Sequence, residues 1–328
     1  MGRGLPTPLL PKRPSRRRVA ILTQPAATPR ALEVAALARV DDLECEVIGL
    51  PDRDEAKTLD VAASVYEALA RFGLERGDTV VGVGGGSVTD VAGFVAGTWL
   101  RGVEAVHLPT TLLGAVDAAI GGKTGVNLAG KNLVGVIWHP TRVIIDVDLL
   151  ELLPGPLVRE GMAEALKSGL VGDPELCRLL MGSGLEAPLD EVVIRSVKVK
   201  ARIVDADERE RGVRAFLNFG HTIGHAIEYA SSLSHGESVA VGMVAACEVS
   251  RHLLGFAGSD LVRSALATLD LPTHVNGLDV ARVRDLLSHD KKRDEHGLRM
   301  VLLEDVGAPT IRSVGAEEIA IGLAAVGL

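Results

Sequence analysis

The stretch TVVGVGGGSVTDVAGFVAGTW, residues 79–99, decides the fold of this chain. Residues 79–83 are apolar and predict a buried strand, and residues 90–99 predict a helix of small residues. The turn Gly84-Gly85-Gly86-Ser87 between them would bring backbone N–H groups close to a phosphate at the start of a helix. The turn matches neither GxGxxG nor the P-loop, and a plain tight turn is the alternative. Its position directly after a buried strand favours nucleotide binding.

The segments on either side of this stretch alternate between strands and helices. Further strands are predicted at residues 18–23, 45–50, 103–108 and 142–146, and helices at residues 29–39 and 58–72. Such alternation predicts a mostly parallel sheet with helices on both faces. We therefore expect a Rossmann-like α/β domain over residues 18–150, preceded by a basic flexible tail over residues 1–17.

The pattern changes after residue 148, where strand-like runs become rare. Helices are predicted at residues 158–171, 191–207, 221–231, 238–254 and 259–269. Near the C-terminus, the apolar run Met300-Val-Leu-Leu is strand-like. We expect a second, α-helical domain over residues 151–328, so that the fold class is α/β plus α.

The composition excludes several classes of protein. The 328 residues include 35 Lys+Arg and 43 Asp+Glu, a net charge of −8, with 47% hydrophobic residues, which is the balance of a globular protein. The acidic balance and the few aromatic residues argue against nucleic acid as a partner. No apolar run is long enough to span a membrane. The cysteines Cys45, Cys177 and Cys247 are widely spaced, which is typical of a reducing cytosol, and we expect a cytoplasmic protein.

Two lysines lie within a glycine-rich stretch in an otherwise apolar region. Lys123 belongs to GGKTGVN, residues 121–127, and Lys131 belongs to GKN, residues 130–132. Glycines there would bring the backbone close to a ligand, and the lysines would meet anionic groups. A solvated loop is the alternative, although such loops usually scatter their charges.

Three histidines predict a metal site in the second half of the chain. His221 and His225 are spaced i and i+4 on a predicted helix, and His235 follows within fifteen positions. Glu164 is a candidate for the carboxylate that completes the ligand set, although its spacing to Lys167 also fits a surface salt bridge. Imidazole and oxygen ligands without thiolate suit Zn²⁺, Co²⁺, Fe²⁺ or Mn²⁺.

Basic residues near this predicted metal site indicate an anionic substrate. They are Lys198, Lys200, Arg202, Arg214, Lys291 and Lys292. A solvated helix face is the alternative for each one singly, and we adopt it for Lys198 and Arg202.

Together these segments resemble the 3-dehydroquinate synthase family, within the sugar phosphate cyclases. The motifs that carry the resemblance are GGGSVTDVAGFVAGTWLRG, LPTTLLGAVDAAIGGKTGVN, GKN, GMAEALKSGL, LNFGHTIGHAIE, HGESVAVGM and DKK. The resemblance implies an N-terminal NAD-binding α/β domain and a C-terminal helical metal-binding domain. It implies NAD- and metal-dependent conversion of 3-deoxy-D-arabino-heptulosonate 7-phosphate to 3-dehydroquinate and phosphate, a step of the shikimate pathway of aromatic amino acid biosynthesis. A homodimer is expected.

The resemblance also implies roles for individual residues. The divalent metal, zinc or cobalt, would be held by Glu164, His221 and His235. His225 would handle protons instead, and the reacting hydroxyls would be surrounded by Asp117, Lys123, Asn132 and Lys167. The substrate's phosphate and carboxylate would be held by Arg101, Lys123, Asn132, Lys200, Arg214, Asn218 and Lys292, with Lys291 as the alternative to Lys292. NAD would be held by Gly85, Gly86, Asp90, Thr110 and Thr111, with Lys123 and Lys131 beside it.

Three other functions stay open at this point. A secondary-metabolism relative such as an aminodehydroquinate synthase would share all the metal and substrate residues. A metal-dependent alcohol or glycerol dehydrogenase would share the GGGS turn and the two-domain plan but would lack the GGKTGVN and GKN lysines. A catalytically inactive NAD-binding protein is the third, and the intact Glu164, His221 and His235 argue against it.

Overall fold

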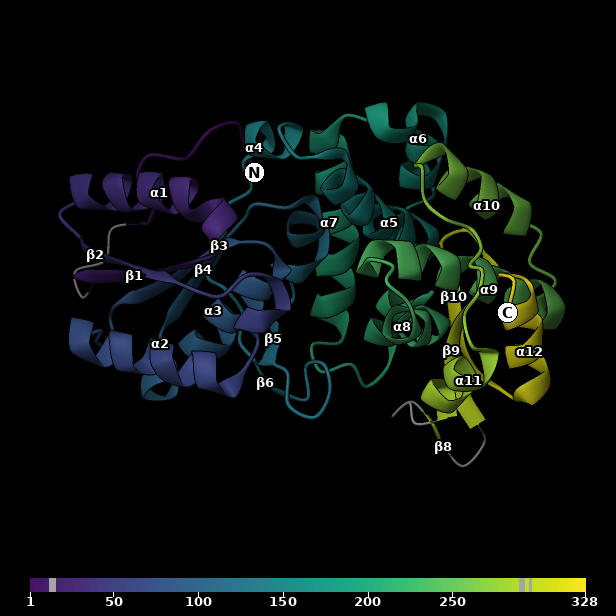
Figure 1. Ribbon diagram of the computed structural model, residues 1–328. Coiled ribbons are helices and arrows are strands. Elements are labelled where there is room, and N and C mark those ends of the chain that lie inside the picture. Colours follow the sequence, from purple (N-terminus) through teal and green to yellow (C-terminus); the bar gives the residue numbers. More distant parts are fainter. Residues whose placement is uncertain (12–15, 289–292, 295–296) are drawn as a thin grey trace. The chain divides into compact units, whose positions relative to one another are not determined.

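The computed structural model describes residues 1–11, 16–288, 293–294 and 297–328. The chain divides into two compact units, Met1–Pro154 and Gly155–Leu328. Figure 1 shows the strands of the parallel sheet in the first unit and mostly helices in the second. This agrees with the predicted fold class of an α/β part followed by a helical part.

The first unit is built on a five-stranded parallel sheet in the order β2-β1-β3-β4-β7. Its strands are β1 (Arg18–Thr23), β2 (Glu44–Gly49), β3 (Thr79–Gly84), β4 (Glu104–Pro109) and β7 (Arg142–Val143). Its helices are α1 (Thr28–Val40), α2 (Leu59–Phe72), α3 (Gly86–Thr98) and α4 (Val147–Glu151). Strand β7 is shorter than the expected 142–146, and α3 begins four residues before the expected residue 90.

Alternate residues of β1 show why this sheet carries helices on both faces. Val19 and Ile21 are buried in the core under α1, while Ala20 and Leu22 are buried in the core under α2 and α3. Figure 1 shows α1 on one side of the sheet and α2 with α3 on the other. Strands buried on both faces are typical of parallel sheets.

The strand order of the parallel sheet reverses at a defined point, next to β1. The chain passes from β1 outward to β2 and then returns to β3 on the other side of β1. In open parallel sheets the crevice lies beyond the carboxyl ends of the strands where the order reverses. Strand β3 ends there at Gly84, and α3 begins at Gly86.

The glycine-rich segment 121–127 contains a strand that the sequence analysis did not predict. Strands β5 (Lys123–Val126) and β6 (Val134–Ile137) form an antiparallel hairpin that packs on α3. A Cβ at Gly125 would lie 2.7 Å from the Val134 carbonyl oxygen, and a Cβ at Gly93 of α3 would overlap Thr124. Gly125, which was interpreted above as part of a ligand-binding segment, therefore allows the close packing of this hairpin.

The N-terminal segment differs from the flexible tail expected over residues 1–17. Leu9 and Leu10 are buried in the core under α1. The Gly2 N–H donates to the Ile145 carbonyl at 3.0 Å, and the Gly2 carbonyl accepts from the Val147 N–H at 3.0 Å. Arg16 is buried in an ion pair with Glu104. The leucines between the basic residues supply the apolar contacts that hold this segment.

The second unit is mostly helical. Its helices are α5 (Gly155–Gly172), α6 (Pro174–Ser183), α7 (Leu189–Ala206), α8 (His221–Ala230), α9 (His235–Leu254), α10 (Ser259–Thr268), α11 (Val280–Ser288) and α12 (Ala316–Ala324). Helix α9 lies centrally, packed by α5, α8, α10 and α12. A Cβ at Gly242 of α9 would overlap the Gly220 carbonyl, so glycine allows α9 to approach the start of α8 closely. Within the described residues, no helix combines the length and apolarity that crossing a membrane requires.

This unit also contains a small sheet that the helical prediction omitted. It is antiparallel, in the order β10-β9-β8, and its strands are β8 (Arg293–Asp294), β9 (Gly297–Asp305) and β10 (Ala308–Val314). The strand-like residues 300–303 lie within β9. Leu302 and Leu303 are buried, and the Leu303 N–H donates to Ser250 Oγ of α9 at 3.0 Å.

Candidate active site

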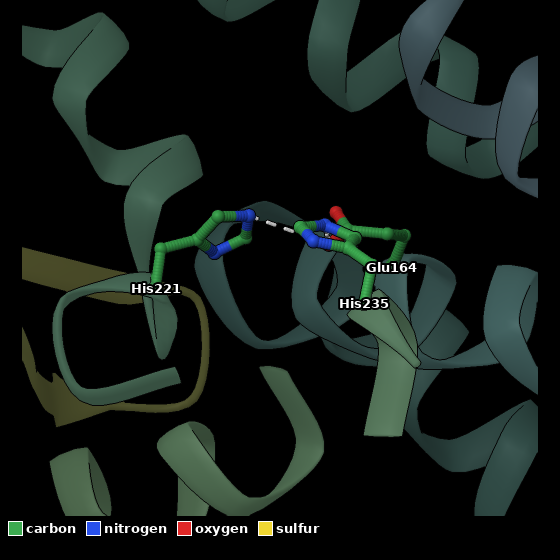
Figure 2. A group of neighbouring side chains, drawn as sticks. All are labelled: Glu164, His221 and His235. Carbon is green, nitrogen blue, oxygen red and sulfur yellow. Dashed lines mark ion pairs between the residues drawn. The ribbon is translucent and has the colours of Figure 1, made fainter. Parts of the chain in front are cut away.

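Three side chains that the sequence analysis assigned to a metal converge in the second unit. Glu164, His221 and His235 each offer a ligand atom, and these atoms lie within 4.8 Å of one another. The Nε2 atoms of both histidines lie 3.5 Å from Glu164 Oε1. Figure 2 shows the two rings approaching the carboxylate from α8 and α9.

The local structure explains how each group is positioned. Glu164 lies in the buried middle of α5. His221 is the first residue of α8, directly after Gly220, whose φ of 79° places the backbone in the left-handed region that glycine favours. His235 is the first residue of α9, and the preceding Ser234 caps this helix by a capping box with Glu237. Each histidine is therefore held at a fixed helix start.

The charges around Glu164 favour its ionised form. Burial raises the pKa of this carboxyl, but the Lys167 ammonium, followed by His221 and His235, holds the pKa well below its ordinary value. Burial and Lys167 lower the pKa of His221 well below its ordinary value. Burial also opposes the charge on His235, yet its hydrogen bonds to Glu164 and Glu228 raise its pKa to about 10.

This donor set fits a divalent cation. Both carboxylate oxygens of Glu164 are buried: Oε2 is paired with the Lys167 ammonium, and Oε1 lies 3.5 Å from the Nε2 atoms of His221 and His235. A buried carboxylate oxygen between two imidazole nitrogens is a ligand arrangement typical of zinc and related ions. Three protein ligands leave room for a substrate oxygen, which is the property of a catalytic rather than a structural site.

His225 lies beside this group. Its ring centroid is 5.1 Å from that of His221 and 6.0 Å from that of His235. It belongs to a second cluster with Glu228 and His235, which overlaps the first through His235.

Glu228, which was not among the predicted site residues, accepts a hydrogen bond from His235. Glu228 Oε2 lies 3.2 Å from His235 Nδ1. The available signal was the spacing of Glu228 to His225, three residues along one predicted helix, which places both on one face.

The expected substrate-binding residues of the second unit surround α5. Lys200 is buried on α7, and Arg214 and Asn218 lie in the 3₁₀ helix Val213–Asn218. Helix α7 and this 3₁₀ helix both pack against α5. Arg214 is only 1% exposed, and its guanidinium donates to the Glu208 carbonyl. The Asn218 amide donates to Glu210. Lys291 and Lys292 lie outside the described residues.

In the first unit, the expected NAD-binding residues gather at the carboxyl edge of the sheet. Gly85 caps α3, and a Cβ there would lie 3.3 Å from Thr111 Cγ2. The Thr110 N–H donates to the Gly84 carbonyl at 2.9 Å. Asp90, in the second turn of α3, pairs with the buried Lys57 ammonium at 2.6 Å. The structure thus brings together residues from the ends of β3 and β4.

Further expected residues lie on the segments around this edge. Asp117 belongs to the π-helical turn Gly114–Ala118, and a Cβ at Gly86 would lie 3.1 Å from Ala118 Cβ. Lys131 Nζ lies 3.8 Å from Asp54, which accepts from Ser87 Oγ at 3.0 Å.

Lys123 and Asn132 lie on the β5–β6 hairpin and its connection. Lys123 is the exposed first residue of β5. The Asn132 N–H donates to Asn127 Oδ1 at 2.9 Å, and its φ of 56° is left-handed. The connection is therefore a defined turn rather than an open loop.

Arg101 lies apart from the other candidates of the first unit. Helix α3 starts at the carboxyl edge of the sheet and has 13 residues, so its far end is about 20 Å away. Arg101 follows that end and precedes the start of β4. Within this unit the structure does not bring Arg101 to Gly85 and Thr111.

The sequence of this chain is similar to sequences of known proteins over most of its length. Residues 47–160 match the family model described as 3-dehydroquinate synthase N-terminal, and residues 161–293 match 3-dehydroquinate synthase C-terminal. The chain is 43% identical to a 3-dehydroquinate synthase of Rhodococcus opacus (strain B4), covering 94% of this chain and 86% of the relative. It is 41% identical to that of Mycolicibacterium vanbaalenii, covering 94% and 89%.

Solved structures with the same fold fall into two groups. A 2-epi-5-epi-valiolone synthase from Streptomyces hygroscopicus, with NAD⁺ and Zn²⁺ bound, is 28% identical with a TM-score of 0.87, covering 94% of this chain and 91% of that one. A 2-deoxy-scyllo-inosose synthase complexed with carbaglucose-6-phosphate, NAD⁺ and Co²⁺ is 27% identical with a TM-score of 0.83, covering 93% and 89%. An iron-containing alcohol dehydrogenase from Thermotoga maritima, at 15% identity and a TM-score of 0.66, covering 95% and 92%, shares the fold alone.

Proposed function

The chain belongs to the 3-dehydroquinate synthase family, and from this premise we propose that it converts 3-deoxy-D-arabino-heptulosonate 7-phosphate to 3-dehydroquinate and inorganic phosphate. The observation that carries the choice is the 43% identity to a 3-dehydroquinate synthase over 94% of the chain. Cyclases with other names among the solved structures are 27–28% identical. NAD and one divalent ion, zinc or cobalt, are its cofactors.

The residues of both units fit these cofactors. Glu164, His221 and His235 would hold the metal, and the backbone at Gly85 and Gly86 would approach the NAD pyrophosphate. When bound, NAD would supply reversible hydride transfer, and the metal would lower the pKa of a substrate hydroxyl. Lys167, paired with Glu164, keeps that carboxylate ionised for its ligand role.

The remaining residues act on the substrate itself. Lys123, Lys200, Arg214 and Lys292 supply the positive charge that a phosphate and a carboxylate require, with Asn132 and Asn218 as hydrogen-bond donors. Arg214 can bind a carboxylate with two parallel hydrogen bonds, which a lysine cannot do. We infer that protons are handled by His225, on α8, and by Asp117, in the π-helical turn.

One assay tests this proposal. The protein is incubated with the heptulosonate phosphate and substoichiometric NAD, and phosphate release, 3-dehydroquinate and NADH are measured together. We expect phosphate and 3-dehydroquinate in equal amounts and no net NADH, because the cofactor is regenerated. Net NADH with a simple alcohol would instead indicate a dehydrogenase.

A different cyclase of the same family is the second candidate, favoured by the structural likeness to cyclases of other names. Glucose 6-phosphate and sedoheptulose 7-phosphate lack the carboxylate and should be rejected, because they leave cationic groups unpaired. Turnover of either at the rate of the heptulosonate would overturn the assignment, and an amino-substituted heptulosonate phosphate as the preferred substrate would indicate an aminodehydroquinate synthase.

The same proposal includes assembly and location. We infer a cytoplasmic location, which the free cysteines Cys45, Cys177 and Cys247 fit, and we propose a homodimer. Sedimentation velocity at micromolar concentration tests the dimer, and a monomer there would contradict it.

A further inference from the structure

We propose that Glu228 is a positioning residue for the metal centre, which accepts the Nδ1–H of His235 and so directs the Nε2 lone pair of that ring toward the ion. The inference rests on the metal site proposed above. Glu228 lies on α8, seven residues before His235. Its side chain is 11% exposed, and its Oε2 lies 3.2 Å from His235 Nδ1.

The chemistry of imidazole gives this contact its meaning. A neutral imidazole carries one N–H and one lone pair, and only the nitrogen with the lone pair can bind a metal. An ionised carboxylate can only accept a hydrogen bond, so the proton must sit on Nδ1. The opposite nitrogen, Nε2, is the one that lies 3.5 Å from Glu164 Oε1.

The other histidine ligand is held in the same way by a different acceptor. His221 Nδ1 lies 3.1 Å from the Phe219 carbonyl, and its Nε2 also lies 3.5 Å from Glu164 Oε1. Both rings thus present Nε2 to one carboxylate oxygen and Nδ1 to an acceptor. Metal-binding histidines almost always have such an outer partner. At His221 the partner is backbone, whereas at His235 it is a side chain that can be replaced.

A second cation is the rival explanation, because His225, Glu228 and His235 also cluster. That site would have to share His235 with the first, and both nitrogens of one ring would then need to be deprotonated. A single proton between His235 and Glu228 satisfies the 3.2 Å contact without this cost. Metal stoichiometry separates the two explanations.

The test uses the full chain, stripped of metal, with Glu228→Leu and Glu228→Gln. Zinc affinity is measured by competition with a chromogenic chelator, and the site geometry is measured by the visible absorption of bound Co²⁺. We expect Glu228→Leu to lose roughly 10–100-fold in zinc affinity, as outer partners typically do. Glu228→Gln retains an acceptor oxygen and should lose less than tenfold.

Helix α9, which carries His235, offers a matched control. Glu248 of α9 has a side chain 12% exposed and pairs with Arg251, thirteen residues beyond His235. Glu248→Leu removes a carboxylate of equal exposure, and it should leave zinc affinity and the cobalt spectrum unchanged. Thermal unfolding of all variants separates loss of folding from loss of the ligand geometry.

The outcomes are distinct. Wild-type affinity and an unchanged cobalt spectrum in Glu228→Leu would overturn this inference while leaving the metal site intact. The second-cation site would be established instead if the wild type bound two zinc ions per chain and Glu228→Leu bound one. The dissociation constant of the tighter site would then be the same in both proteins. Failure of the wild type to bind a divalent ion would overturn the proposed metal site itself. Should Glu228→Leu not fold, ¹⁵N spectra of the zinc-bound wild type decide, since zinc on Nδ1 of His235, or a proton on its Nε2, would contradict the role.

Discussion

The two units hold their candidate groups by different means. In the second unit, side chains from three helices converge, and each is oriented by a further side chain or carbonyl. In the first unit, the candidate groups are backbone N–H groups at the carboxyl ends of β3 and β4. The side chains there are small, so that a ligand can approach this backbone. A metal needs specific donor atoms, whereas a pyrophosphate needs N–H groups that every residue except proline carries.

This difference predicts different responses to substitution. Removing one donor from the second unit should weaken metal binding strongly, because each donor atom fills one position around the ion. In the first unit, the backbone donors persist, and a substitution acts through crowding or through stability.

The largest effect is expected for His235→Ala. Loss of one of three metal ligands should weaken zinc binding by roughly 1,000-fold or more, well beyond the 10–100-fold typical of an outer partner. Elemental analysis of the purified variant and NAD titration measure the two sites separately. Full metal occupancy with normal turnover would remove His235 from the site, while loss of NAD binding as well would show that the two sites do not respond separately.

The next effect concerns stability of the first unit. Lys57→Met leaves Asp90 of α3 without the buried ammonium 2.6 Å away. Removing one partner of a buried pair costs about 3 kcal/mol or more, and we expect a lower unfolding temperature with metal content unchanged. The double variant Lys57→Met with Asp90→Asn should recover part of the loss. Equal stability of Lys57→Met and wild type would show that the pair is not significant.

A smaller effect is expected from pH through His107 of β4. Burial lowers the pKa of His107 to about 4, although its bond to the Ala119 carbonyl opposes this shift. The folded state then binds fewer protons than the unfolded state, so stability present above pH 6.5 is lost as the pH falls toward 4. Between pH 7 and pH 5 the loss is about 2 kcal/mol. Denaturant unfolding at several pH values measures it, and His107→Gln should show a shallower dependence than wild type.

The smallest effect is expected for Gly85→Val. The backbone at Gly85, with φ −73° and ψ −171°, is extended, so the substitution acts by crowding of Thr111 rather than by backbone strain. Overpacking of this kind costs about 1–3 kcal/mol, and we expect NAD affinity to fall roughly tenfold with metal content unchanged. Calorimetry with NAD measures it. Unchanged affinity in the folded variant would mean that the turn has only a structural role.

The sequence predicted the parts of the molecule that have a local signal. Residues 79–84 and 18–23 are apolar runs between turns, and both are strands. The spacing of His221, His225 and His235 predicted a metal group, and the structure brings Glu164 to two of them.

The parts that the sequence did not predict depend on distant partners. The spacing of Glu228 to His225 does not reveal its role, because that role depends on His235 at the start of another helix. Strand β5 contains Lys123 and Gly125, and glycine weakens a strand pattern unless a neighbouring backbone approaches closely. The N-terminal segment looked flexible since its basic residues conceal Leu9 and Leu10.

The N-terminal segment, residues 1–11, contacts residues that are synthesised much later. Arg3 forms an ion pair with Asp148 at 2.5 Å, and these residues are 145 positions apart in the sequence. The Gly4 N–H donates a hydrogen bond to the Asp146 carboxylate, 142 positions away. At a translation rate of about 5–20 residues per second, Arg3 and Gly4 are synthesised roughly 7–30 s before their partners. Docking of the segment can only follow the synthesis of β7 and α4. Contacts of such long sequence separation slow folding, and they make the first unit complete only when its whole length is present.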